Sequence, residues 1–163
     1  MNRIVVYTSK TGFTAKYANW IAEELGCEVV ELKKVKKNEL ANYDTVIYGG
    51  WIMANMVNGY NKIAALNLSN VVVFGVGMSV PTEEVFNQIA EQNNVSKDKF
   101  FYFEGGYNPK KLNFIQKAMM NMIKKSIEKK EPKTDDDIHM LETFTGKDNT
   151  DKEAIRPLIN SVV

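Results

Sequence analysis

The chain has 163 residues, of which 44% are hydrophobic and 25% charged, and its formal net charge is +1. This length and balance are ordinary for a globular protein, so we expect a single domain over residues 1–163. No apolar run is long enough to span a bilayer, a single cysteine excludes an internal disulfide, and a single histidine without Cys or His neighbours predicts no metal site. The strand pattern beginning at residue 3 predicts no signal peptide and hence a cytoplasmic protein.

The first half of the chain alternates short apolar runs with helical patterns. In chain order these predict a strand at 3–7, a helix at 13–25, a strand at 27–32, a short helix at 36–41, a strand at 45–48 and a helix at 58–65. Gly26 is expected to end the first long helix as a left-handed cap. Gly49 and Gly50 are expected to stop the third strand, so that residues 51–56 form a loop.

The second half continues the alternation. It predicts a strand at 71–75, a helix at 82–92, a strand at 100–103, a long helix at 109–130 and a less regular tail at 134–163. Thr82 is the expected N-cap of its helix, and Pro109 suits a first helical turn. In the tail, Thr134 and the three aspartates after it predict the cap of a short turn. Thr150 and Glu153 have the spacing of a capping box, and Pro157 is expected to kink a helix there.

Five strands that alternate with helices predict an α/β fold, with a parallel sheet covered by helices on both faces. Ligands of such sheets bind beyond the carboxyl ends of the strands. Loops 8–14, 49–56 and 77–82 follow the first, third and fourth strands and occupy this edge. We therefore expect the three loops to converge on one ligand.

The turn after the first strand has the features of a phosphate cradle. Backbone N–H groups and the dipole at a helix N-terminus favour an anion, and the hydroxyl side chains of the turn add donors. The turn lacks both the glycine-lysine pattern of nucleoside triphosphate sites and the three glycines of dinucleotide sites, which points to a single terminal phosphate. The predicted cradle comprises Thr8, Ser9, Lys10, Thr11, Gly12, Phe13 and Thr14.

The loop after the third strand is apolar where a solvated loop is normally polar. Trp51 among apolar neighbours predicts the wall of a flat aromatic ligand such as a flavin, whose polar edge needs nearby backbone groups. A Trp51 that plugs the core is the alternative. Gly105 and Gly106 form a further candidate wall, unless a tight turn requires them. The predicted ring contacts are Gly50, Trp51, Ile52, Met53, Ala54, Gly77, Met78, Ser79 and Tyr107.

The turn at 8–14, the Gly49-Gly50-Trp51 sequence and Gly77 resemble a flavodoxin domain over nearly the whole chain. The resemblance implies a three-layer sandwich with a five-stranded parallel sheet in the order 2-1-3-4-5. It also implies non-covalent FMN, with the phosphate at 8–14 and the ring between the loops that hold Trp51 and Met78. The loop at 77–82 lacks the aromatic residue that many electron-carrier flavodoxins place over the ring, unless Tyr107 takes this role.

A narrower resemblance rests on Phe103-Glu104-Gly105-Gly106, on Lys111-Leu112-Asn113-Phe114 before a basic helix, and on Thr150-Asp151. These sequences are similar to the flavodoxin-type, menaquinone-dependent protoporphyrinogen IX dehydrogenases. That resemblance implies a role in heme biosynthesis, with electrons passing from a porphyrinogen through FMN to menaquinone at the membrane. The flavin would supply the chemistry, so no side chain is predicted to be catalytic.

Charge separates an enzyme from a carrier, because electron-carrier flavodoxins are strongly acidic and this chain is not. Residues 109–133 carry eight lysines against Glu128 and Glu131. The apolar side of helix 109–130 is expected to pack on the core. It comprises Leu112, Ile115, Met119, Met122, Ile123 and Ile127.

The lysines of helix 109–130 suit an anionic membrane surface or the propionates of a porphyrin, with a plain solvated face as the alternative. We therefore expect an oxidoreductase that passes electrons to a quinone, with peripheral membrane contact through this helix and no nucleic-acid partner. A flavodoxin that carries electrons between protein partners is the second hypothesis. A flavin-free module that binds another phosphate or a protein is the third.

Overall fold

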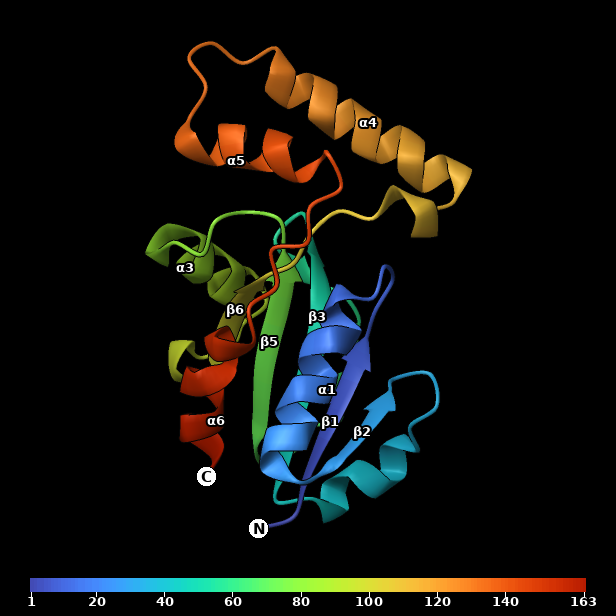
Figure 1. Ribbon diagram of the computed structural model, residues 1–163. Helices are drawn as coiled ribbons and strands as arrows, with labels where there is room; N and C mark the ends of the chain where they lie inside the picture. Colours follow the sequence, from blue (N-terminus) through green and yellow to red (C-terminus); the bar gives the residue numbers. More distant parts are fainter.

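The computed structural model describes residues 1–163 and contains a parallel sheet between two helical layers, with a pair of helices above one edge of the sheet (Figure 1). Its strands are β1 (Arg3–Thr8), β2 (Glu28–Glu31), β3 (Thr45–Met53), β4 (Met56–Val57), β5 (Val71–Gly77) and β6 (Phe100–Glu104). The five long strands pair in parallel in the order β2-β1-β3-β5-β6, and the short β4 pairs with β3 in the antiparallel sense. The α/β fold and the predicted order 2-1-3-4-5 of the parallel strands are confirmed.

The helices connect the strands and cover both faces of the sheet (Figure 1). They are α1 (Phe13–Leu25), α2 (Tyr60–Ala64), α3 (Glu83–Gln92), α4 (Phe114–Glu128), α5 (Asp135–Thr143) and α6 (Arg156–Val162). Single 3-10 turns are η1 (Lys37–Asn42), η2 (Lys97–Lys99), η3 (Pro109–Lys111) and η4 (Lys152–Ile155). No helix combines the length and the apolar character that crossing a bilayer requires.

The core consists of two clusters, one on each face of the sheet. Alternate strand residues point to opposite faces, so that Val5 packs with α1 and α6 while Val6 packs with α2 and α3. Both faces of the central strands are therefore buried, which explains their nearly continuous apolar sequences. The sheet is a rigid platform whose carboxyl edge carries the predicted loops.

Strand β3 corrects the prediction that Gly49 and Gly50 end the third strand, because it continues through both glycines to Met53. A Cβ atom at Gly49 would lie 2.0 Å from Cζ of Phe74, and one at Gly50 would lie 2.5 Å from the carbonyl oxygen of Asn58. The two glycines are thus required by close packing within the sheet rather than by a turn. The predicted loop at 51–56 is a hairpin, whose reversal lies at Ala54 and Asn55, both with positive φ.

The basic helix differs from its prediction in both start and packing. Residues 109–111 form η3, and α4 begins at Phe114, where Asn113 and Gln116 form a capping box. The apolar side of α4 does not pack on the sheet. Ile115 is 76% exposed and Met122 71% exposed, while Ile127 is the one fully buried residue of the helix. Helix α4 instead packs against α5 above the carboxyl edge of the sheet (Figure 1).

The tail contains more regular structure than its sequence predicts. Thr134 caps α5 through a capping box with Asp137, and the helix continues to Thr143 rather than ending after one turn. Asp151, not Thr150, caps the next turn by accepting a hydrogen bond from the N–H of Glu153. Pro157 lies in the first turn of α6, where its missing N–H costs nothing, so the helix is not kinked.

Candidate functional site

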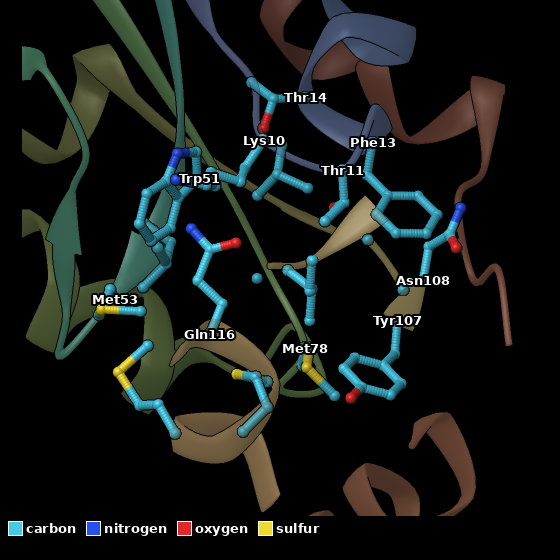
Figure 2. Close-up of a pocket in the computed structure, with 18 residues that line it drawn as sticks. Lys10, Thr11, Phe13, Thr14, Trp51, Met53, Met78, Tyr107, Asn108 and Gln116 are labelled. Carbon is cyan, nitrogen blue, oxygen red and sulfur yellow. The ribbon is translucent and has the colours of Figure 1, made fainter. Parts of the chain in front are cut away.

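A cavity of about 230 Å³ lies between the ends of β1, β3, β5 and β6 and the helix α4 (Figure 2). The predicted site residues that line it are Lys10, Thr11, Phe13, Thr14, Trp51, Ile52, Met53, Gly77, Met78 and Tyr107. The predicted residues that do not line it are Thr8, Ser9, Gly12, Gly50, Ala54 and Ser79. The predicted loops therefore do converge, and a fourth loop, after β6, joins them.

The turn at 8–14 presents free hydrogen-bond donors to the cavity. Gly12 adopts φ 102° at the N-cap of α1, and no side chain caps this helix. The N–H groups of Thr11, Phe13 and Thr14 have no acceptor within the protein, whereas the N–H of Gly12 donates to Ser9 Oγ at 3.2 Å. Free N–H groups at the positive end of a helix form an anion site.

Thr8 and Ser9 do not line the cavity, and their side chains form hydrogen bonds within the protein that hold the turn in place. The Tyr48 hydroxyl donates to the carbonyl oxygen of Asn58 at 2.6 Å and lies 2.9 Å from Thr8 Oγ1. Burial raises the pKa of Tyr48 to about 12, so this phenol stays protonated and keeps its role as a donor. The hydroxyls left for a ligand are those of Thr11 and Thr14.

Strand β3 provides one wall of the cavity, with Trp51 and Met53 on the same side of the view (Figure 2). Trp51 belongs to neither core cluster and is partly exposed, so its ring is a surface of the cavity. Ala54 lies outside the cavity at the tip of the β3–β4 hairpin. Trp51 thus lies in the wall of the cavity and does not plug either core cluster.

The loop after β5 is held in place from two sides. The Tyr102 hydroxyl donates to the carbonyl oxygen of Ser79 at 2.8 Å, and burial raises the pKa of Tyr102. Asp136 of α5 accepts a hydrogen bond from the N–H of Val80 at 2.8 Å. Gly77 and Met78 line the cavity from this side, whereas Ser79 does not.

The loop after β6 supplies a wall that the sequence indicated only weakly. Gly105 and Gly106 line the cavity, and neither has a positive φ. A Cβ atom at Gly106 would lie 2.3 Å from the carbonyl oxygen of Lys147, so close packing and not a tight turn requires this glycine. Tyr107 follows them and packs edge-on against Phe144, with ring centroids 5.0 Å apart.

The segment that returns from α5 runs beside the start of this loop. The N–H of Tyr107 donates to the carbonyl oxygen of Lys147 at 3.0 Å, and the N–H of Asn149 donates to that of Gly105 at 2.9 Å. Gly106 and Asp148 form an isolated antiparallel bridge. Residues 107–147 therefore leave the sheet edge and return to it at one place.

Helix α4 covers the cavity, which the sequence analysis missed. Gln116 points into the cavity from α4 (Figure 2). The lining residues from this segment are Leu112, Gln116, Met119 and Met120. Of these, Leu112 and Met119 belong to the apolar side that was predicted to pack on the core, whereas Gln116 and Met120 were not predicted to face anything. Asn108 and Val76 complete the lining without any sequence signal.

The α4–α5 pair is fastened to the sheet edge through α5. His139 contacts Glu104 at the end of β6, and Asp136 binds the loop after β5. Within the pair, Lys130 donates to the buried carboxylate of Asp137 at 2.7 Å, and together with the Thr134 cap this lowers the pKa of Asp137 to about 2. Asp137 is thus charged at neutral pH, and the junction between the two helices is ionic.

Comparison with known proteins identifies a family for this chain. A family model described as flavodoxin domain matches residues 4–135, which include all of the sheet except its first residue, Arg3. No protein of curated function matches the sequence. Among solved structures, a flavodoxin from the domain Archaea is 18% identical, with 77% of this chain and 98% of that chain covered and a TM-score of 0.46. Oxidised flavodoxin 2 from Bacillus cereus is 21% identical, with coverages of 76% and 96% and a TM-score of 0.41.

Proposed function

This chain belongs to the flavodoxin-domain family, whose cofactor is FMN, and from that premise we propose that it is an FMN-dependent oxidoreductase whose substrate reacts beneath α4. Bound FMN supplies transfer of one or two electrons. The protein's own residues hold the cofactor, shape the cavity and exclude competing oxidants.

The residues at the sheet edge fit this cofactor. The free N–H groups of Thr11, Phe13 and Thr14 suit a phosphate, and the hydroxyls of Thr11 and Thr14 add donors. Trp51 and Met78 offer apolar walls to a flat ring, and Gly77 brings backbone within reach of its polar edge. No acidic side chain lines the cavity, which favours an anionic cofactor.

The cover formed by α4 is the observation that favours an enzyme over an electron carrier. A carrier has to bring its cofactor against the surface of a protein partner, and a helix over the cavity stands in the way. Leu112, Gln116, Met119 and Met120 instead enclose an apolar space above the predicted ring position. An apolar small molecule fits such a space, since methionine side chains adapt to irregular shapes.

The proposed reaction is the oxidation of a porphyrinogen with a quinone as electron acceptor, as in protoporphyrinogen IX dehydrogenases. Support comes from the sequences at 103–106 and 111–114, which lie in the loop after β6 and at the start of the cover. In the lysine-rich segment 109–133, ion pairs are formed by Lys124, Lys130 and Lys133. Lys110, Lys117, Lys125 and Lys129 form no ion pair and remain free to attract carboxylates of a substrate.

The outer face of α4 supports a contact with a membrane, where a quinone would be met. Phe114 is 87% exposed, and Ile115 and Met122 of the same helix are 76% and 71% exposed. Lysines flank this apolar strip, as in helices that lie in the surface of an anionic bilayer. An unpartnered apolar strip of this kind is uncommon on a monomer.

We expect FMN-loaded protein to oxidise protoporphyrinogen IX anaerobically with a menaquinone analogue, and to do so faster when anionic vesicles are present. Porphyrin fluorescence measures the product. Bound FMN that exchanges electrons with a flavodoxin reductase, without porphyrinogen turnover, would identify a carrier. Failure to bind FMN would leave the flavin-free module.

Replacement of Trp51 by alanine is expected to weaken FMN and riboflavin equally, by about tenfold, because stacking on an aromatic ring contributes about 1–3 kcal/mol. Quenching of flavin fluorescence measures both affinities. Met56→Ala is the control, since Met56 is exposed on the same hairpin and lies outside the cavity. If Trp51→Ala leaves flavin affinity intact while the melting temperature of the apoprotein falls sharply, Trp51 is a core residue.

A further inference from the structure

The ammonium group of Lys111 lies directly over the turn at 8–14. A Cβ atom built at Gly12 would be 3.1 Å from Lys111 Nζ, and no other heavy atom outside the immediate chain neighbours lies within 4 Å of that position. Lys111 is the last residue of η3, in the segment that leads to the cover helix α4. A residue of the cover thus places a cation at the predicted phosphate cradle.

Lys111 is exposed to solvent, and its ammonium lies near an end of α1 that is itself electropositive. The cradle has unpaired N–H groups and the positive end of the α1 dipole, both of which repel an ammonium. Lys111 Nζ forms no ion pair and donates no hydrogen bond to the protein, so no carboxylate compensates. A phosphate in the cradle would meet backbone N–H groups on one side and the ammonium of Lys111 on the other.

We propose that Lys111 binds the phosphate of the flavin and that this contact ties the start of α4 to the cradle; the inference rests on FMN being the cofactor. The contact has two consequences. The protein then prefers FMN to riboflavin more strongly than it would with the turn alone. A phosphate on the flavin also makes the start of α4 more ordered.

The test compares Lys111→Gln with Lys110→Gln, which removes the same charge from the neighbouring position; both lysines are exposed. Dissociation constants for FMN and for riboflavin are measured by fluorescence quenching at two salt concentrations. Lys111→Gln is expected to weaken FMN by about five- to tenfold, to leave riboflavin unchanged and to reduce the salt dependence of FMN binding. Lys110→Gln should leave the ratio of the two affinities as in the wild type, and Lys111→Arg should restore most of it.

Hydrogen exchange tests the link to the cover. FMN should protect residues 109–120 of the wild type more than riboflavin does, and this difference should vanish in Lys111→Gln. Equal FMN affinities for Lys111→Gln and Lys110→Gln would overturn the inference while FMN binding itself stands. A wild-type protein that binds neither flavin would instead overturn the proposed function.

Discussion

Replacement of Gly49 by alanine is expected to lower the free energy of unfolding by about 3 kcal/mol, although it adds a single methyl group. That methyl would lie 2.0 Å from Cζ of Phe74, a ring that is fully buried on β5. Phe74 cannot retreat easily, because it packs against Phe103 with ring centroids 5.6 Å apart. Urea denaturation of the apoprotein, followed by circular dichroism, measures the loss.

The partner substitution Phe74→Leu provides the control. Alone it should destabilise the protein, because it leaves a cavity in the core. Combined with Gly49→Ala it should recover part of the stability, because the added methyl then occupies space that the ring has vacated. Strictly additive losses in the double variant would show that the two residues do not compete for space.

Removal of both cradle hydroxyls, in the variant Thr11→Val with Thr14→Val, is expected to weaken FMN by more than about a hundredfold. Each hydroxyl would donate to a charged phosphate, and such a bond contributes about 1.5–3 kcal/mol. Valine keeps the shape of threonine, so the apoprotein should fold normally. Riboflavin, which has no phosphate, should bind almost as before, and isothermal titration calorimetry distinguishes the two ligands.

Thr8→Val is the matched control, because Thr8 lies in the same turn but contacts Tyr48 instead of the cavity. Its ratio of FMN to riboflavin affinity should stay close to the wild-type value. An equal loss of FMN in Thr8→Val and in the double variant would mean that the turn acts through its fold rather than through hydroxyl contacts.

The sheet and its binding edge were predictable, because strand periodicity and the alternation of strands with helices are local signals. The length of β3 was not predictable, because two consecutive glycines locally predict the end of a strand at Gly49 and Gly50. What keeps them in the strand is the ring of Phe74 and the carbonyl of Asn58, contacts made only after neighbouring strands pair. Tertiary packing here overrides local propensity.

The placement of α4 shows a second limit of sequence reasoning. Periodicity identified an apolar side but could not say what it would face, because a core, a ligand and a membrane all favour the same residue types. The capping box at Asn113 explains why the helix starts only after the η3 turn, whereas its position above the sheet edge depends on tertiary contacts with α5. The same placement brings Lys111 to the cradle, a contact between two segments that no local pattern connects.

The chain leaves the sheet edge at residues 105–107 and returns at residues 147–149, where the two segments are joined by backbone hydrogen bonds. The α4–α5 segment is therefore an insertion whose two ends lie side by side. Its length is therefore free to vary without moving β6 or α6, since the entry and exit points already adjoin. The contacts of α5 with Glu104 and Val80 hold the same segment to the sheet edge at two further places. A variant without residues 108–146 would lose these contacts and the part of the cavity wall that α4 provides.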